Sequence, residues 1–383
     1  MPKFRSFTRH LFIFLNGLVV LLFLLACANG FLRPGKWWLI SLLGLAFPYL
    51  FLFLACCLIG TLFVRSLRPW SLVSLVALLI GWSNIRHFLA LHPGGRFQHE
   101  RVSGATLRLL TWNVRSFDEF LTRKRPLLRH RPHMLDFIGS QDADILCLQE
   151  FYEPLTRHGS ESNIDYIRDR LHYPYYYFSR DHVRPGLYEA GVVIFSRFPI
   201  IDSFLYSYPR PMGFRTTESL IATDILAGRD TIRVYTTHLQ SVLFGSKEFR
   251  DIEIIKNVDD SIVDASRSIV RKLRDAFWAR GQQAEQVRER LDSCRYPAFI
   301  CGDFNDVPNS YTYATIRGNW RDAWLQKGFG IGRTYKNISP TLRIDYILTA
   351  PALDVLQCRK ISVPWSDHNP VEADLELTAP GPR

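Results

Sequence analysis

PAFICGDFNDVPNS, residues 297–310, is the stretch that decides the fold. Its apolar run at 298–302 predicts a buried strand, and this strand runs abruptly into Asp303 and Asn305. Alternate residues of a strand share a face, so these two side chains are expected on one side while Phe304 packs on the other. An Asp/Asn turn after a strand is common in any α/β protein, so the meaning of the pair depends on its partners elsewhere in the chain.

Short apolar or β-branched runs recur from residue 106 onward, with turn residues between them. Several alternate in the manner of half-buried strands, and others are apolar throughout, as in a sheet covered on both faces. Helical periodicity is present at 126–141 and over the long charged stretch 247–293. The pattern predicts a mixed α/β domain, most simply two packed sheets with helices outside. The expected strands are 107–112, 144–149, 191–196, 219–226, 231–239, 297–303, 342–349 and 371–377.

The N-terminal third is strongly apolar. Runs without interior charge occupy residues 11–32, 37–64 and 70–82, the last extending to span length if it continues to Leu91. A helix of about 20 apolar residues crosses a bilayer core, so we expect three membrane spans. A cleaved signal peptide is the alternative for the first run, but that run is long for a signal sequence and two more follow it. The expected organisation is a transmembrane segment at 1–91, a linker at 92–105 and a folded α/β domain at 106–379.

Most of the formal net charge of +11 belongs to the transmembrane segment. Residues 1–91 hold eight of the 47 Lys and Arg and no Asp or Glu, which leaves 39 basic against 36 acidic residues in the remainder. A balance of only +3 is weak support for a polyanion-binding surface on the folded domain.

Basic residues in the short loops set the expected orientation. Five of them precede the first span or follow the second, and two lie between these spans, which favours a cytoplasmic N-terminus. Three spans would then place the domain outside the cytoplasm, although Arg86, Arg96 and Arg101 favour the reverse. We expect a multi-pass protein of the inner or plasma membrane, which contacts the lipid bilayer through its helices. We expect no obligate protein partner.

Polar side chains close several expected strands. Taken singly, each would be an ordinary turn or surface residue, but strand ends converge in space and can line one pocket. The set consists of carboxylates, carboxamides and two histidines, a combination that suits Mg²⁺ or Mn²⁺ and the hydrolysis of phosphoesters. The seven cysteines, by contrast, show neither zinc-site spacing nor a disulfide framework. The residues are Asn113, Gln149, Glu150, His238, Asp303, Asn305, Asp345, Asp367 and His368.

Six ordered motifs in this set resemble those of the endonuclease/exonuclease/phosphatase superfamily. The resemblance covers residues 106–377 and implies a four-layer α/β/β/α sandwich with its site at one edge of the two sheets. It also implies hydrolysis of phosphodiester or phosphomonoester bonds. The motifs are TWN (111–113), LQE (148–150), THLQS (237–241), GDFN (302–305), RIDYIL (343–348) and SDHNP (366–370).

The resemblance implies a metal site. In it, Glu150 is the principal Mg²⁺ ligand, Asn113 lies beside it and Asp367 is a second contact. Some nucleases of the superfamily carry an additional acid where this chain has Arg115, so a single metal ion is expected. Asp118 could replace that acid, and Arg115 could instead bind a substrate phosphate.

The resemblance also implies catalytic roles. Asp303 would position or deprotonate the attacking water, and Asn305 would donate to a phosphate oxygen. His238 would contact phosphate or act as an acid. His368 would act as a general base or stabilise the transition state, with Asp345 fixing its tautomer, because a histidine aimed at phosphate needs an acceptor behind it.

Three readings of the function stay open. A nuclease is favoured by RIDYIL, which is closer to the nuclease branch than to the inositol phosphatases. A lipid or head-group phosphodiesterase is favoured by the membrane anchor and the short linker. A catalytically silent, membrane-tethered binding protein is allowed by Arg115.

Overall fold

The structure is a computed structural model of the 383-residue chain, and it describes residues 2–93, 97–102, 107–119, 130–155, 161–209, 219–242 and 262–377. Its contacts group the chain into two compact units. The N-terminal unit consists of Met1–Leu89, Ser241–Ala284 and Asp306–Ile316, and the sheet unit of Ala90–Gln240, Glu285–Asn305 and Arg317–Arg383.

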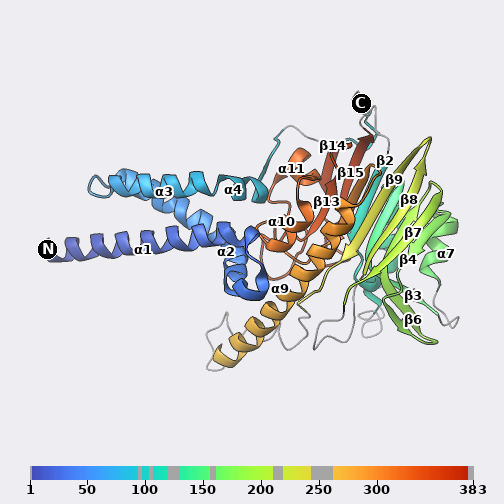
Figure 1. Cartoon of the computed structure of the whole chain (residues 1–383), viewed down its shortest axis with the longest axis horizontal. Helices are drawn as coiled ribbons and strands as arrows, with labels where there is room; N and C mark the ends of the chain where they lie inside the picture. The colour runs from blue at the N-terminus through green and yellow to red at the C-terminus, as the bar shows by residue number, and fades with distance from the viewer. Residues whose placement is uncertain are drawn as a thin grey trace. The chain divides into compact units, whose positions relative to one another are not determined.

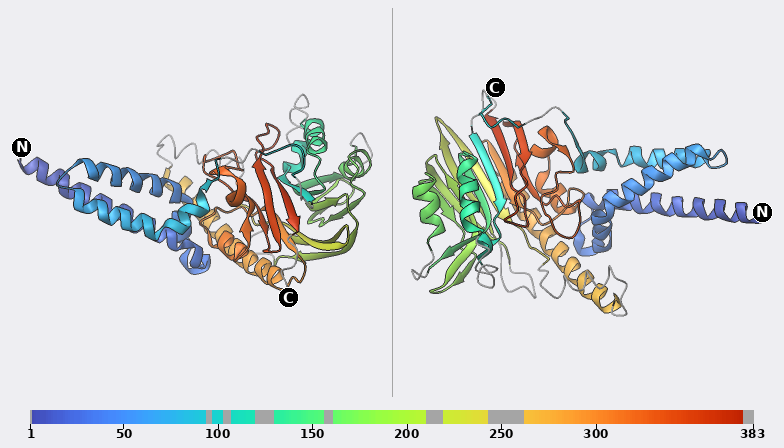
Figure 2. Two further views of the ribbon diagram at one scale, coloured as in Figure 1. Left: turned by 90° about the horizontal axis from the view of Figure 1, so that it is seen from above. Right: turned by 180° about the vertical axis from the view of Figure 1, so that it is seen from behind.

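Two large sheets form the sheet unit. Figures 1 and 2 show them face to face. The six-stranded sheet has the order β11 (Arg321–Asp322), β13 (Asp345–Thr349), β10 (Ala298–Asp303), β9 (Asp230–His238), β8 (Ser219–Ala227) and β7 (Ile200–Ser207). The seven-stranded sheet has the order β14 (Leu353–Lys360), β15 (Val371–Leu377), β2 (Leu107–Asn113), β3 (Ile145–Pro154), β6 (Tyr188–Ser196) and β4 (Tyr175–Phe178), with β5 (His182–Arg184) also on β6.

The main core lies between the two sheets. Fully buried aliphatic and aromatic side chains from both meet there, among them Leu109 and Ile194 of one sheet and Val234 and Phe299 of the other. A second core, around Trp112, packs the opposite face of the seven-stranded sheet against α6 (Arg131–Ser140) and α7 (Asn163–Asp165). The expected mixed α/β fold with two packed sheets is confirmed.

Helices form most of the N-terminal unit. Two stretches, Ser6–Phe31 and Pro34–Phe63, are long and apolar enough to cross a membrane. The third expected span consists of two helices, Arg68–Ile80 and Trp82–Phe88, with a bend of 61° between them. They form a third membrane span only if the bent pair crosses the membrane as a single span. The helices are α1 (Pro2–Ala28), η1 (Asn29–Phe31), α2 (Pro34–Phe63), α3 (Arg68–Ile80) and α4 (Trp82–Phe88).

Segments from the far half of the chain also belong to the N-terminal unit. Asn29 Nδ2 donates to the backbone oxygen of Asn309 at 2.8 Å, and Asn84 Nδ2 donates to Asn309 Oδ1 at 3.2 Å. Arg280, on α9 (Ile262–Asp292), forms a buried ion pair with Asp306 at 3.2 Å. The predicted boundaries, with residues 106–379 as one domain, stay a prediction. Because parts of that range group with the N-terminal helices, the functional tests use the full chain. The part of the expected helix at 247–261 lies outside the described residues.

Gly302 is required where β10 lies against β9. Its φ is +134°, and a Cβ added there would lie 2.1 Å from the backbone oxygen of Thr237. Only glycine tolerates both the backbone conformation and this close approach. The apolar run before Asp303 therefore ends at a position that requires glycine.

We expect Gly302→Ala to destabilise the protein by about 3 kcal/mol or more, because backbone strain adds to a steric clash. Gly228→Ala is the matched control, since Gly228 has a φ of +68° but a Cβ added to it would meet nothing within 4 Å; it should cost only about 1 to 2 kcal/mol. Thermal unfolding of the detergent-purified full chain, followed by near-UV circular dichroism, measures both. Equal losses in the two variants would show that the contact with Thr237 has no role.

Candidate active site

Three neighbouring strands of the six-stranded sheet place polar side chains in one row. Asp303 ends β10 opposite His238, which ends the parallel strand β9. On its other side Asp303 pairs with Asp345, the first residue of the antiparallel strand β13. The strand register therefore brings together three residues that lie far apart in the sequence.

The seven-stranded sheet contributes Asn113 and Glu150. Asn113 is the last residue of β2, and Glu150 lies in β3 where the pairing with β6 shifts register, with a φ of +50°. Such an irregularity re-aims a side chain relative to the strand. Asn113 Nδ2 donates to Glu150 Oε1 at 3.1 Å and to Asp303 Oδ2 at 3.0 Å, so this carboxamide links the two sheets.

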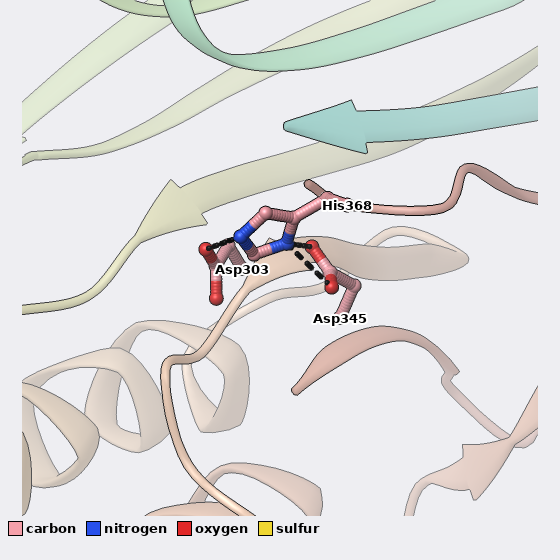
Figure 3. A group of neighbouring side chains, drawn as sticks. All are labelled: Asp303, Asp345 and His368. Atoms are coloured by element: carbon pink, nitrogen blue, oxygen red, sulfur yellow. Dashed lines mark hydrogen bonds and ion pairs between the residues drawn. The ribbon is translucent and has the colours of Figure 1, made fainter. Parts of the chain in front are cut away.

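His368 is held in place from several sides. Its Nδ1 lies 2.9 Å from Asp345 Oδ2 and its Nε2 lies 3.7 Å from Asp303 Oδ2, as Figure 3 shows. Its backbone nitrogen donates to Ser366 Oγ at 3.1 Å, and its backbone oxygen accepts from Trp112 Nε1 at 3.0 Å. The imidazole is therefore fixed, with Nε2 directed toward Asp303.

Burial and the charges of neighbouring groups shift the pKa values of Asp303 and His368. Burial, and then the charge of Asp345, raises the pKa of Asp303 to about 6, although His368, His238 and Asn113 act in the opposite direction. Burial lowers the pKa of His368, but the charges of Asp345 and Asp303 outweigh it and raise this pKa to about 10. His368 is therefore held in its charged form, opposite an Asp303 carboxyl group whose raised pKa suits a group that accepts a proton from water.

The three residues Asp303, Asp345 and His368 could also hold a metal ion. Each offers one ligand atom, and these atoms lie within 4.8 Å of one another. Asn113, predicted as a metal ligand, would have to present its Oδ1 to the ion. In the structure its Oδ1 accepts from the backbone nitrogen of Arg115 at 3.0 Å, and its amino group faces the carboxylates.

Asn305 departs from the expectation that it shares a strand face with Asp303. Strand β10 ends at Asp303, and Asn305 lies beyond it with a φ of +52°. Its Nδ2 donates to the backbone oxygen of Leu239 at 2.9 Å, while its backbone nitrogen donates to Asp303 Oδ1 at 2.8 Å. The prediction from strand alternation was therefore wrong for Asn305, whereas Phe304 is fully buried and packs on Tyr346 as expected for a core residue.

The remaining predicted residues surround this centre. His238 Nε2 lies 3.6 Å from Asp303 Oδ2 and 3.9 Å from Glu150 Oε1. The predicted second metal contact, Asp367, pairs with Arg115, whose Nε lies 3.5 Å from its Oδ2. Asp118, considered as a replacement acid, lies 2.8 Å from His130 Nδ1.

Sequence reasoning missed Tyr335. Its ring centroid lies 4.9 Å from that of His368, and the two residues form an isolated β-bridge. A single tyrosine in a loop carries no local signal of this role, because the contact depends on two loops that meet only in the folded protein.

Comparisons with known proteins identify the family of the chain. Residues 110–368 match the family model described as the endonuclease/exonuclease/phosphatase family, and residues 9–88 match a domain of unknown function, DUF8431. The search of curated proteins gave no match.

Several solved structures are similar to this chain. A family member from Beutenbergia cavernae DSM 12333 is 23% identical, with 71% of this chain and 72% of that chain covered and a TM-score of 0.50. A family protein from Leptotrichia buccalis C-1013-b is 16% identical over 71% and 100% of the chains, with a TM-score of 0.47. The human Nocturnin catalytic domain is 19% identical over 71% and 94%, with a TM-score of 0.48. The family match spans more than half of the sequence, and the chain belongs to the endonuclease/exonuclease/phosphatase family.

Proposed function

We propose that the protein is a membrane-anchored phosphodiesterase that depends on a divalent cation. The observation that carries this proposal is the position of Asp303 Oδ2. It accepts from Asn113 at 3.0 Å and faces the Nε2 atoms of His238 and His368 at 3.6 and 3.7 Å. A carboxylate held beside two imidazoles can accept a proton from water while the imidazoles stabilise a phosphate.

The donor set fits Mg²⁺ or Mn²⁺. Three carboxylates, those of Glu150, Asp303 and Asp345, converge on the site, and carboxylate oxygens are the ligands these ions prefer. We assign Glu150 as the principal ligand because its side chain remains 39% exposed beside the buried row, open to an ion and a substrate. When bound, a divalent cation would neutralise charge on the phosphate oxygens.

We assign to Asp303 the role of holding the attacking water and accepting its proton. Its two oxygens are fixed by the backbone nitrogen of Asn305 and by Asn113 Nδ2, so the carboxylate cannot rotate freely. In hydrolysis the water oxygen attacks phosphorus, the P–O ester bond breaks, Asp303 accepts the water proton, and the leaving alkoxide takes a proton from His238, which regains one from solvent.

His368 is the residue that we assign to the developing charge on phosphate. Asp345 accepts from Nδ1, which leaves Nε2–H as a donor toward a phosphate oxygen. His238 presents its Nε2 from the other side of Asp303 and can donate to the same group. The Asn305 side chain could donate to a phosphate oxygen only after it released the backbone oxygen of Leu239. We therefore assign Asn305 first to holding the Asp303 carboxylate through its backbone nitrogen.

Nucleic acid and lipid head groups are the two candidate substrates. The near-balanced charge of residues 92–383 gives little support to polynucleotide binding, whereas two helices able to cross a membrane would keep the protein at a lipid surface. A steep loss of affinity with added salt would indicate nucleic acid, and a requirement for lipid dispersions would indicate the head group.

Asp303→Asn and His368→Ala should each lower the rate of hydrolysis by at least about 100-fold, because each removes a group that acts in the transition state. The assay uses the full chain in detergent with Mg²⁺ or Mn²⁺ and three substrates: bis(p-nitrophenyl) phosphate, an oligonucleotide and phospholipid dispersions. Asp202→Asn, an exposed acid on β7, is the control and should leave the rate unchanged. Unaltered rates in the first two variants would reject these roles, and a silent binding protein would hydrolyse none of the substrates.

Glu150→Gln should weaken Mn²⁺ binding by at least about 10-fold, since it removes the charge of the assigned ligand. Calorimetric titration of the full chain measures this, with Asp169→Asn, an exposed acid paired with Arg168, as the control. If Glu150→Gln binds Mn²⁺ like the wild type and Asp345→Asn does not, the ion belongs to the Asp303, Asp345 and His368 group instead.

Asp345→Asn should lower the rate about 10- to 100-fold in the otherwise normal protein, and have little further effect when His368 is already alanine. This follows because Asp345 acts through His368. Steady-state kinetics of the two single variants and the double variant provide the test. Fully additive losses would mean that Asp345 has a separate role.

A further inference from the structure

A basic pocket begins one residue beyond His368. Its volume is about 490 Å³, within the range of small-ligand sites. Three cationic side chains line it, those of Arg333, Lys336 and Lys360, together with Ser362 and Asn369. None of these residues has a role in the proposed hydrolysis.

The three cations are held by neutral oxygens. Lys336 Nζ donates to the backbone oxygen of Val363 at 2.6 Å, and Lys360 Nζ donates to Ser362 Oγ at 3.0 Å. Arg333 donates to the backbone oxygens of Tyr335, at 2.8 Å, and of Lys336. Among the residues that the structure describes, none places a carboxylate within ion-pair distance of these cations.

Positive charge in the pocket is poorly compensated. Burial lowers the pKa of Lys336, and Arg115, Arg333 and Lys360 lower it further against the opposing charge of Asp367. Burial and Arg333 likewise lower the pKa of Lys360. Like charges held this close favour an anion among them.

The pocket shares its backbone with the active site. The backbone nitrogen of Lys336 donates to the backbone oxygen of Asp367 at 2.9 Å, and Tyr335 pairs with His368. Asn369 follows His368 directly, and its Nδ2 lies 3.4 Å from the backbone oxygen of Arg333. The pocket is therefore built on the two loop segments that also carry Tyr335 and His368 of the active site.

From this placement we infer that the pocket binds a second phosphate group, carried by the same substrate molecule as the phosphodiester that is cleaved. The inference rests on the proposed function. Two ammonium groups and a guanidinium match the charge and the acceptor oxygens of a phosphate. The volume also leaves room for part of the group to which that phosphate is attached. The substrate class is thus a phosphodiester with an additional phosphate, from a nucleotide chain or from a phosphorylated head group.

Two matched substrate pairs test this in the full chain. One is the dinucleotide TpT with and without a 5′-phosphate, and the other is glycerophosphoinositol with and without a 4-phosphate. In at least one pair, kcat/KM should be about 10-fold or more higher for the member with the additional phosphate. The pair that shows the preference identifies the source of the phosphate.

The preference should fall by about 10-fold or more when Lys336→Ala and Lys360→Ala are combined. Lys360→Arg keeps the charge and should retain most of it, and Lys327→Ala, on the exposed end of α11 (Ala323–Lys327), is the control that leaves it unchanged. Equal kcat/KM within both pairs, or a preference that survives in the double variant, overturns the inference.

Calorimetric titration with inorganic phosphate separates this inference from the proposed function. If the protein hydrolyses no diester, the proposed function fails, but phosphate binding that is lost in the double variant still supports the pocket. Phosphate binding equal in wild type and double variant overturns it. Unfolding temperatures of the variants show whether each is folded.

Discussion

One oxygen of the Asp303 carboxylate connects the two sheets and both histidines. Oδ2 accepts from Asn113 of the seven-stranded sheet and faces His238 and His368. This position depends on the register of β9, β10 and β13, and on Gly302, which lets the two parallel strands approach closely. The fold therefore brings the strand-end residues together through backbone pairing, and hydrogen bonds from Asn113 and the backbone of Asn305 then fix the Asp303 carboxylate.

Much of the site could be predicted because several of its residues, Asn113, His238 and Asp303 among them, end strands. Apolar runs followed by polar residues are visible in the sequence, and strand ends in one sheet converge. His238 and Asp303 are paired in the structure, and Asp345 with His368 forms the expected dyad. The apolar N-terminal runs were equally clear, because hydropathy and length decide whether a helix can cross a membrane.

The remainder depended on local geometry or on tertiary contacts that carry no sequence pattern. A positive φ takes Asn305 out of its strand, and a shift in register re-aims Glu150. The Arg115–Asp367 pair and the contact of Tyr335 with His368 join separate loops. The grouping of residues 306–316 with the helices likewise arises from contacts between segments more than 200 residues apart.

Central to the proposed mechanism is the attack of water, held at Asp303, on the phosphorus of a diester. It is tested most directly by hydrolysis of bis(p-nitrophenyl) phosphate in ¹⁸O-enriched water by the full chain with Mn²⁺, followed by mass spectrometry of both products. The mechanism predicts one ¹⁸O atom in the phosphate-containing product and none in p-nitrophenol. Label in p-nitrophenol, or no product above the metal-only blank, would contradict it.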